Sequence, residues 1–405
     1  MTASIIIRGG REKPILNQHP WVFSGAIESV KGSPQPGEIV TVLARDGKFL
    51  GRGYWNPKSQ IQVRLLTWRD EDINDDWWRA RITQAVTSRE LYRLDHRAYR
   101  LINAENDFLP GLVVDRYEDA ESGETWLSLQ ALTLGIDQRK AELAQMLAEM
   151  DMTVTGVYER SDVDVRKLEG LQPTKGALIG IEPPKRITIA ESGIRLQVDV
   201  RAGHKTGFYL DQAPNRILAG KLASRGPDSI KRVLNLFSYT GGFSLHTLAN
   251  GADLTVNVDS SREALEMAEE NTAINGYAPE RAEFIQANVF ELLRDFASEG
   301  QQFDLVVLDP PKFAQTAQQV ERAARGYKEL NLKAFQIVRP GGCLMTFSCS
   351  GAITADLFQK IVFGALADSG RQAQILRHLG PGEDHPIALT FPEGAYLKGL
   401  LLRVF

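Results

Sequence analysis

The sequence is poor in cysteine, and this scarcity excludes several kinds of protein. Its 405 residues include two cysteines, Cys343 and Cys349, so we expect neither a disulfide framework nor a metal site of the cysteine-based zinc type. No run of residues is long and apolar enough to cross a bilayer, and no apolar core of signal-peptide length precedes the first charges. These absences predict a cytoplasmic protein with no membrane partner and no metal, in which thiols stay reduced and can act as nucleophiles.

Other common features are missing as well. The sequence has no internal repeat and no low-complexity tract, and no Gly-x-Gly-x-x-Gly motif indicates a pyrophosphate cradle. A hydrophobic content of 43% and a charged content of 24% are typical of a globular protein. The length predicts two or three domains.

The first 70 residues are basic, although the whole chain has a net charge of −4. They contain ten Lys or Arg and five Asp or Glu, and four β-like runs separated by Gly and Pro turns predict a small β-barrel or sandwich. Basic side chains contact phosphates and aromatic rings stack on bases, which favours RNA binding. Two alternatives remain: the charges form an ordinary solvated surface, and the aromatics, Trp21 and Phe23 above all, fill the barrel core. The predicted strands are Ser4–Arg8, Glu38–Leu43, Phe49–Trp55 and Ile61–Leu66.

A mixed α+β region is expected next, over residues 71–185. It opens with an acidic hinge and a helix from Trp77 to about residue 94, and it ends at a Pro-Pro-Lys linker. Strands are predicted at Gly111–Arg116, Thr125–Ala131 and Gly156–Glu159, with a helix at Asp137–Met150.

From residue 186 the pattern changes to alternating strands and helices. A hairpin over Ile187–Val200 comes first, and the alternation that follows specifies a doubly wound parallel sheet of the α/β class. The predicted strands are Val233–Phe237, Thr255–Asp259, Glu283–Asn288, Phe303–Asp309 and Gly342–Ser348, with Ala388–Phe391 and Leu397–Phe405 as antiparallel edges. The predicted helices are Gln212–Leu222, Phe243–Ala249, Arg262–Asn275, Val289–Ala297, Ala317–Val338 and Ala355–Ala367.

The first three strands end in residues that suit one small molecule. The first runs into a glycine turn from Phe237 through Tyr239 to Gly241, where a ligand can approach the backbone. The second ends at Asp259, which suits ribose hydroxyls, and the third at Asn288, whose amide can accept a hydrogen bond from an adenine amino group. Together, these residues predict a ligand that contains adenosine but no phosphates, and S-adenosylmethionine fits this description. Tyr209 and Asp211, just before the sheet, are further candidate ligands, although an ordinary turn explains them too.

The fourth and fifth strands carry the candidate chemistry. Asp309-Pro310-Pro311-Lys312 follows an apolar strand, and the prolines hold a rigid extended turn beside which an acidic group can pair with a planar base. Cys349 follows the fifth strand; a thiolate can add to C6 of a pyrimidine and make C5 nucleophilic. The alternatives are a plain strand-ending loop and a small buried hydrophobic residue. Cys343, at the other end of that strand, is interpreted as structural.

Nine segments resemble one known family along essentially the whole chain. It is that of the bacterial 23S ribosomal RNA cytosine-C5 methyltransferases of the large-subunit methyltransferase I type. The segments are Arg8–Lys13, His19–Gly25, Leu109–Tyr117, Arg160–Asp162, Gly203–Gln212, Phe237–Ser244, Asp309–Phe313, Phe347–Gly351 and Pro392–Leu400.

The resemblance implies three domains and a reaction. The domains are a PUA RNA-binding domain over 1–70, a central α+β domain over 71–185 and a Rossmann-like methyltransferase domain over 186–405. The implied reaction moves a methyl group from S-adenosylmethionine to C5 of a cytosine in 23S ribosomal RNA, with Cys349 bonded to C6. Cys349, Asp309 and Lys312 are the candidate catalytic residues. Lys312 stands where many such enzymes carry a second cysteine, and Asn288 where family members usually have an acidic residue.

Substrate RNA contacts are expected from Arg8, Arg11, Lys13 and Lys398, and a homodimer is left open. Two other functions are also open. One is methylation of another base position, such as an amino group or guanine, with Cys349 incidental. The other is a non-catalytic RNA-binding assembly factor.

Overall fold

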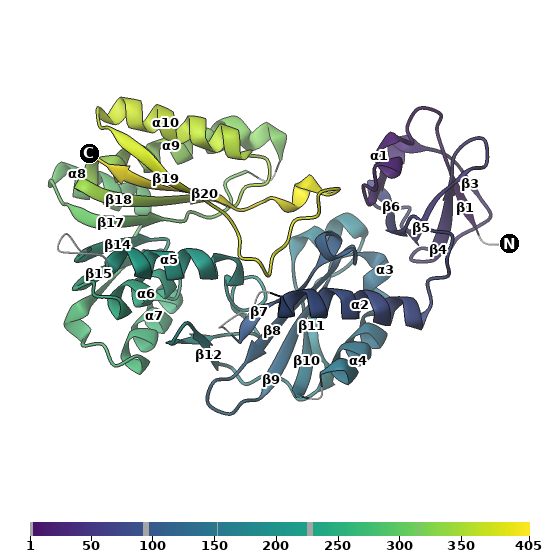
Figure 1. Ribbon diagram of the computed structural model, residues 1–405, viewed down its shortest axis with the longest axis horizontal. Coiled ribbons are helices and arrows are strands. Elements are labelled where there is room, and N and C mark those ends of the chain that lie inside the picture. The colour runs from purple at the N-terminus through teal and green to yellow at the C-terminus, as the bar shows by residue number, and fades with distance from the viewer. Residues whose placement is uncertain (1–2, 92–96, 152, 225–229, 315) are drawn as a thin grey trace. The chain divides into compact units, whose positions relative to one another are not determined.

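The computed structural model describes residues 3–91, 97–151, 153–224, 230–314 and 316–405, and it divides into two compact units (Figure 1). The N-terminal unit comprises Met1–Ile189, Val198–Leu210 and Glu383–Gly394. The C-terminal unit comprises Ala190–Gln197, Asp211–Gly382 and Ala395–Phe405. The expected three-domain boundaries stay a prediction.

The N-terminal unit begins with a six-stranded sheet in the order β2-β6-β5-β4-β1-β3. All four predicted strands are confirmed, and two short ones, β2 and β3, were not predicted. The elements are β1 (Ser4–Ile7), α1 (Lys13–Leu16), β2 (Trp21–Phe23), η1 (Ser24–Ala26), β3 (Ile27–Lys31), β4 (Ile39–Leu43), β5 (Phe49–Trp55) and β6 (Ile61–Thr67).

The expectation that Trp21 and Phe23 fill the barrel core is wrong. Side chains alternate along a strand, and in β2 it is Val22 that points inward and is buried. Phe23 is 48% exposed. Trp21 is half-buried, and its indole N–H donates to Oε1 of Glu105 at 2.8 Å.

A second sheet in this unit has five strands in the order β11-β10-β9-β8-β7. The two helices and three strands predicted here are confirmed, whereas β7 and β11 were not predicted. The elements are α2 (Asp75–Glu90), β7 (Ala98–Asn103), η2 (Ala104–Asp107), β8 (Leu112–Glu118), β9 (Thr125–Ala131), α3 (Leu134–Asp137), α4 (Lys140–Met150), β10 (Val154–Ser161), η3 (Asp164–Glu169) and β11 (Thr174–Gly180).

Helix α2 begins two residues earlier than expected because its N-cap is Asn74. The Asn74 side chain accepts the backbone N–H of Trp77 at 3.0 Å, which satisfies one of the free donors of the first turn. Trp77, Trp78 and Ile82 then bury the inner face of the helix in the core of this sheet. The expected helix end near residue 94 lies outside the described residues.

The C-terminal unit is the predicted doubly wound α/β domain. Its seven-stranded sheet has the order β16-β15-β14-β17-β18-β20-β19, in which β14 to β18 are parallel and β20 runs antiparallel to both neighbours. The strands are β14 (Arg232–Leu236), β15 (Leu254–Asp259), β16 (Ala282–Gln286), β17 (Phe303–Leu308), β18 (Val338–Ser348), β19 (Ala373–Leu379) and β20 (Lys398–Val404).

Helices cover both faces of this sheet (Figure 1). One core packs α5 and α6 against it, and a larger one packs α8, α9 and α10 on the other side. The hairpin of β12 (Ile187–Glu191) and β13 (Ile194–Val198) precedes them, as predicted. The other elements are η4 (Leu210–Gln212), α5 (Ala213–Ala223), α6 (Gly242–Ala249), α7 (Arg262–Ile274), η5 (Pro279–Arg281), α8 (Val289–Ser298), η6 (Ala317–Gln319), α9 (Val320–Ile337), α10 (Ala355–Ser369) and η7 (Pro392–Gly394).

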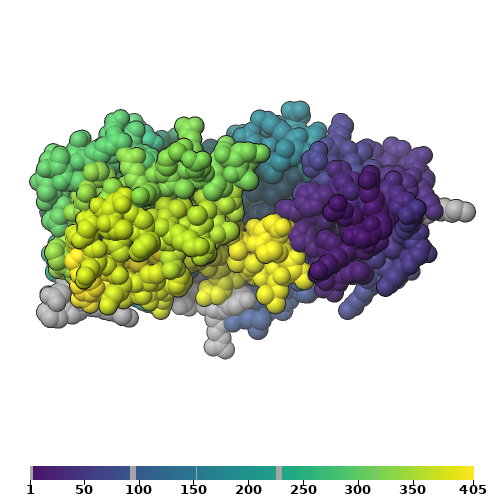
Figure 2. All heavy atoms as spheres, turned by 90° about the horizontal axis from the view of Figure 1, so that it is seen from above, coloured from purple at the N-terminus to yellow at the C-terminus, as the bar shows by residue number. Residues whose placement is uncertain are grey.

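The strand predicted at Ala388–Phe391 is wrong. Its place at the sheet edge is taken by β19, and the chain then leaves the sheet to join the N-terminal unit. There the ring of Phe391 lies 4.8 Å from that of Trp21, and yellow spheres accordingly meet purple ones in Figure 2. The contact with Trp21 explains Phe391, whereas Leu389 of the same segment is fully exposed.

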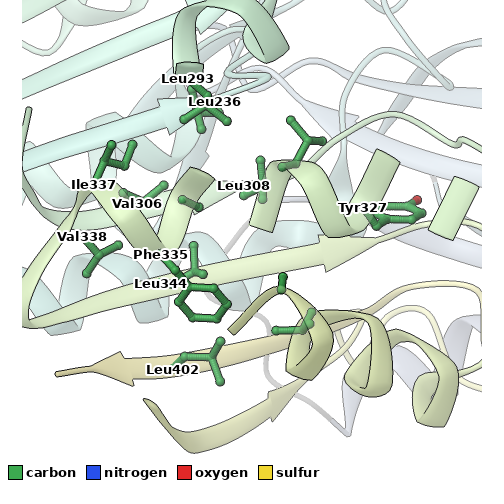
Figure 3. Close-up of a cluster of buried hydrophobic side chains, with 14 of the residues drawn as sticks. Leu236, Leu293, Val306, Leu308, Tyr327, Phe335, Ile337, Val338, Leu344 and Leu402 are labelled. Atoms are coloured by element: carbon green, nitrogen blue, oxygen red, sulfur yellow. The ribbon is translucent and has the colours of Figure 1, made fainter. Parts of the chain in front are cut away.

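The larger core fixes the strands that carry the candidate chemistry. Figure 3 shows Val306 and Leu308 of β17 beside Leu344 of β18 and the ring of Phe335. All four side chains are buried, and each contributes about 1.5–3 kcal/mol by leaving water. The ends of β17 and β18 are thereby held side by side.

Candidate active site

The turn after β14 is conformationally unusual. Phe237 and Tyr239 have φ of 58° and 47°, in the left-handed region that side chains other than glycine rarely adopt. Gly241 follows with φ 81°, and a Cβ there would lie 3.1 Å from that of Ala268, so glycine is required. Strained backbone of this kind concentrates at ligand sites.

Asp259, at the end of β15, holds this turn in place. Its Oδ2 accepts the Tyr239 backbone N–H at 2.9 Å, and its Oδ1 accepts that of Ser261 at 2.9 Å. A carboxylate oxygen has two lone pairs, so both oxygens can still accept a hydroxyl donor. The predicted carboxylate thus lies against the predicted turn, at the carboxyl edge of the sheet.

Polar groups beneath the turn are partly unsatisfied. Ser244 Oγ donates to Asn257 Oδ1 at 2.6 Å and accepts from Asn235 at 3.1 Å, which forms a buried network that the sequence did not reveal. Within the described part of the chain, the buried hydroxyls of Ser238 and Thr240 have no hydrogen-bond partner. A buried polar group without a partner is costly, so the turn is suited to a polar ligand.

Asn288 follows the third parallel strand, β16, as predicted, but it also has a structural role. Its side-chain oxygen accepts the Phe290 backbone N–H at 2.9 Å and caps α8. The same oxygen keeps a second lone pair for an amino group.

Asp309 is positioned by a residue that sequence reasoning did not identify. It follows β17, and its Oδ2 accepts from Nε2 of Gln212 at 2.9 Å. The Gln212 oxygen accepts in turn from Asn215 at 2.6 Å. Gln212 and Asn215 lie nearly 100 residues before Asp309, so no local pattern could have revealed the pair.

The structure brings Cys349 to the Asp-Pro-Pro turn. Cys349 follows β18, the parallel neighbour of β17, and its Sγ lies 4.0 Å from the carbonyl oxygen of Pro310. Both loops leave the same edge of the sheet, where ligands bind in open α/β folds. The predicted neighbourhood of Cys349 and Asp309 is therefore present.

Hydrogen bonds that involve hydroxyl groups connect the loop after β17 with the loop after β18. Ser350 Oγ accepts the backbone N–H of Ala314 at 3.1 Å and lies 3.0 Å from the Tyr327 hydroxyl. Ser348 Oγ donates to the same hydroxyl at 2.9 Å. Tyr327 is fully buried in α9, and burial raises its pKa, so it stays a neutral phenol. These bonds fix the backbone on both sides of Cys349.

Lys398 supports the Cys349 loop from β20. Its Nζ donates to the carbonyl oxygens of Ser350 at 2.8 Å and Ile353 at 2.6 Å, and the side chain is buried. Burial lowers the pKa of Lys398 to about 8, Cys349 opposes this shift, and the positive charge of Lys312 adds to it. The sequence suggested that Lys398 contacts RNA; its ammonium here holds the loop of the candidate nucleophile.

The remaining predicted residues are more dispersed. Asp211 is buried in the C-terminal unit, where its Oδ2 accepts from the Tyr396 hydroxyl at 2.6 Å. Tyr209 belongs to the N-terminal unit, and its hydroxyl lies 3.1 Å from Nδ1 of His204. Lys312 is exposed on the turn after Asp309.

The basic residues predicted to contact RNA lie on the first sheet and its helix. Arg8, Arg11 and Lys13 are exposed between the end of β1 and the start of α1. Arg8 also donates from Nε to the carbonyl oxygen of Ile27 at 2.9 Å. In the described ranges, no helix has the length and apolarity to span a membrane, and no three His, Cys, Asp or Glu side chains cluster as a metal site would require.

Two family models match this chain. Residues 171–403 match the S-adenosylmethionine-dependent methyltransferase model, and residues 5–68 match the PUA-like domain model. The protein is therefore an S-adenosylmethionine-dependent methyltransferase with an N-terminal PUA-like domain, and the predicted cofactor and fold are confirmed.

Full-length relatives narrow the family further. Ribosomal RNA large subunit methyltransferase I of Tolumonas auensis is 47% identical over 407 residues, and that of Shewanella amazonensis 47% over 408, each covering 100% of both chains. The chain belongs to the ribosomal RNA large subunit methyltransferase I family.

Solved structures agree on the fold. SMU.776 in complex with SAH covers 99% of each chain with a TM-score of 0.84 at 20% identity. A second structure, from Streptococcus mutans, gives a TM-score of 0.82 at 20% identity with 99% of each chain covered.

Proposed function

We propose that this enzyme methylates C5 of a cytosine in the large-subunit, 23S ribosomal RNA, and that Cys349 forms a covalent bond to C6 during the reaction. The observation that carries the proposal is the placement of Cys349 Sγ 4.0 Å from the Pro310 carbonyl oxygen, next to Asp309 at the carboxyl edge of the sheet. The name of the full-length relatives supports ribosomal RNA as the substrate.

The glycine turn and its surroundings would hold the cofactor. The turn from Phe237 to Gly241 offers close backbone approach and two unsatisfied hydroxyls, and Asp259 offers carboxylate oxygens to ribose. Asn288 would accept from the adenine amino group, and Asp211 of the same unit would complete the site. Bound S-adenosylmethionine supplies an electrophilic methyl group on sulfonium.

The protein side chains would activate the base. The thiolate of Cys349 adds to C6, and the electron pair of the C5–C6 bond moves toward C5, which then takes the methyl group. Asp309, in its protonated form, donates its proton to N3 of the cytosine as negative charge develops there, and takes it back when the C6–S bond breaks. A base removes the C5 proton, the C6–S bond breaks, and the thiolate is restored. Because Lys312 occupies the place of a second cysteine, Cys349 serves as the sole thiol throughout.

The basic surface of the PUA-like domain would hold the RNA. Arg8, Arg11 and Lys13 are exposed and suited to phosphate contacts, and the target base must flip out of its stack to reach Cys349. A cytoplasmic location, the three domain boundaries and a homodimer accompany this proposal as predictions.

The test uses ribosomal RNA that contains 5-fluorocytosine. With S-adenosylmethionine present, the fluorine blocks removal of a proton from C5, so wild-type enzyme should stay bonded to RNA in a denaturing gel. Cys349→Ala should give no such complex and no methyl transfer, while binding of S-adenosylmethionine by calorimetry is retained. Cys343→Ala, which removes the other thiol, from the middle of β18, is the matched control and should behave as wild type.

Two results would overturn the proposal. Full methyl transfer by Cys349→Ala would exclude the thiol as nucleophile. Mass mapping that places the methyl group on an amino group or on guanine would favour the alternative base position.

A further inference from the structure

A cavity of about 640 Å³ lies in the N-terminal unit and shares no residue with the candidate active site. Its walls come from the end of β6, from α2, from the loop after α1 and from the residue after η2. Cavities of this size commonly hold small molecules or single nucleotides. Neither the proposed chemistry nor the sequence motifs give it a role.

Three aromatic side chains line the cavity. The indole N–H of Trp68 donates to the Ile15 carbonyl oxygen at 2.8 Å, and that of Trp77 donates to Oε1 of Glu71 at 3.2 Å, so both rings are held in place. Phe108 is 39% exposed. Trp77 is buried and Arg81 lies over it, so the exposed ring of Phe108 is the one suited to stacking on a planar base.

Two guanidinium groups add positive charge. Arg69 makes no side-chain hydrogen bond or ion pair with any residue that the structure describes, and Arg81 lies over the Trp77 ring at 5.2 Å with one bond to Gln84. Burial lowers the pKa of Arg81, Glu71 opposes that shift, and the neighbouring charge of Arg69 adds to it. A bound anion would relieve the repulsion between the two cations.

Glu71 supplies an acceptor beside these rings. Its Oε1 already accepts from the Thr67 hydroxyl at 2.5 Å and from Trp77. Oε2 accepts no hydrogen bond from residues in the described ranges, so it is available to donors. Base amino groups are such donors, and the cavity thus combines an acceptor for a base edge with cations for a phosphate.

Backbone strain marks the same cavity. Gln18 and Phe108 both line it, and both adopt left-handed φ, 62° and 60°. Such conformations cost about 1–3 kcal/mol in residues other than glycine and persist mainly at functional sites. The two strained residues come from different loops, so their meeting at one cavity is not a property of a single turn.

We propose that this cavity binds one unpaired nucleotide of the RNA, with its base against Phe108 and its phosphate at Arg69 and Arg81. The proposal depends on RNA being the substrate. It adds a second anchoring site, distinct from the pocket that receives the target cytosine.

The test compares full-length variants in RNA binding and methyl transfer. Arg69→Gln/Arg81→Gln should raise KM for RNA at least tenfold with kcat unchanged, and should reduce the dependence of binding on salt. Phe108→Gly removes the ring at a position where glycine is unstrained, and should weaken RNA binding about fivefold or more. Arg79→Gln is the matched control, because Arg79 lies on the same helix outside the cavity and pairs with Glu149.

Titration with single nucleotides distinguishes a cavity that binds a nucleotide of RNA from one that binds a free nucleotide. Tryptophan fluorescence titrated with CMP or AMP should show only weak, millimolar binding if the cavity serves RNA. Micromolar binding of a free nucleotide, together with unchanged RNA affinity in the double variant, would overturn the RNA assignment. If wild type methylates RNA and the double variant has the same KM as Arg79→Gln, the cavity proposal fails while the proposed function stands.

Discussion

At the scale of single residues, Lys398 links the electrostatics of the site to its backbone. Its ammonium bonds two carbonyl oxygens of the loop that carries Cys349, and its charge interacts with the thiol. An ammonium near a thiol favours the thiolate, which is the nucleophilic form. With its pKa lowered to about 8, Lys398 keeps this charge below that pH and loses it above.

Replacing Lys398 should therefore move the pH at which Cys349 reacts. In Lys398→Gln and Lys398→Met, alkylation by iodoacetamide should require a higher pH than in wild type. Glutamine retains a donor for the loop but no charge, so a shift in both variants identifies the charge as the cause. If Lys398→Gln were alkylated with the same pH dependence as wild type, the amine would act only through its hydrogen bonds. Labelling measured in Cys349→Ala comes from Cys343 and is subtracted as background.

Tyr327 offers a second test of how the loop is held. Tyr327→Phe leaves Ser348 and Ser350 without their shared partner, and should cost about 1 kcal/mol in the free energy of unfolding by urea. Because the loop that carries Cys349 then loses one of its anchors, while the bond from Ala314 to Ser350 remains, kcat should fall more than donor affinity changes. An unchanged kcat with reduced stability would limit Tyr327 to a structural role.

Few of these supporting partners could be read from the sequence. Asp309 and Cys349 were identified because a motif and a strand end mark them locally. Gln212 and Lys398 reach the same site from elements far away in sequence, and their contacts exist only once the sheet is assembled. Long-range polar partners carry no local signal, whereas residues at the ends of parallel strands do.

At the scale of elements, the parallel strands and their helices were predictable, but several antiparallel strands were not. Strands β14, β15 and β17 and the second half of β18 are largely buried runs rich in apolar residues, which is a strong signal. Strand β19 is mostly exposed, and β2 has three residues, so neither shows a clear pattern. In segment 388–391, Phe391 packs on Trp21 and Leu389 is fully exposed, so its apolar residues misled the edge-strand prediction.

A buried ion cluster fastens the β12–β13 hairpin to the helices of the C-terminal unit. Glu191 pairs with Arg216 of α5 at 2.6 Å and with Nε2 of His246 of α6 at 2.9 Å, and all three are buried. Burial alone would raise the pKa of Glu191, but Arg216 and His246 together hold it well below its ordinary value of 4.5. The carboxylate therefore stabilises the fold above that ordinary value, and the contribution is lost as pH falls below it.

Glu191→Gln should change the acid side of the stability curve. At pH 7 it leaves Arg216 without its carboxylate and should cost about 3–5 kcal/mol in unfolding by urea. Below the ordinary pKa of 4.5 the difference from wild type should shrink, because the carboxylate of the unfolded chain becomes protonated there. Glu266→Gln, which breaks an exposed pair with Arg262, is the control and should cost less than about 0.5 kcal/mol. A pH-independent difference down to pH 3 would contradict the assignment.

At the scale of the whole molecule, charge is distributed unevenly along the chain. The first 70 residues carry a positive balance although the net charge is −4, so the remainder would repel a polyanion. Binding of RNA must then depend on a limited set of cations that displace counterions from phosphates. Arg8, Arg11 and Lys13 are exposed members of that set.

Neutralising these three residues should weaken RNA binding and make it less sensitive to salt. For Arg8→Gln/Arg11→Gln/Lys13→Gln, the slope of log affinity against log salt should fall by about 0.7 for each phosphate that the protein no longer neutralises, hence by about 2 in total. Binding of S-adenosylmethionine should be unchanged, because its residues lie in other elements. The control replaces three exposed cations of the C-terminal unit, Arg262, Arg325 and Lys360, by glutamine. Equal slopes in the two triple variants would mean that the PUA-like domain does not supply the phosphate contacts. A slope reduced only in the Arg8, Arg11 and Lys13 variant would locate those contacts in the PUA-like domain.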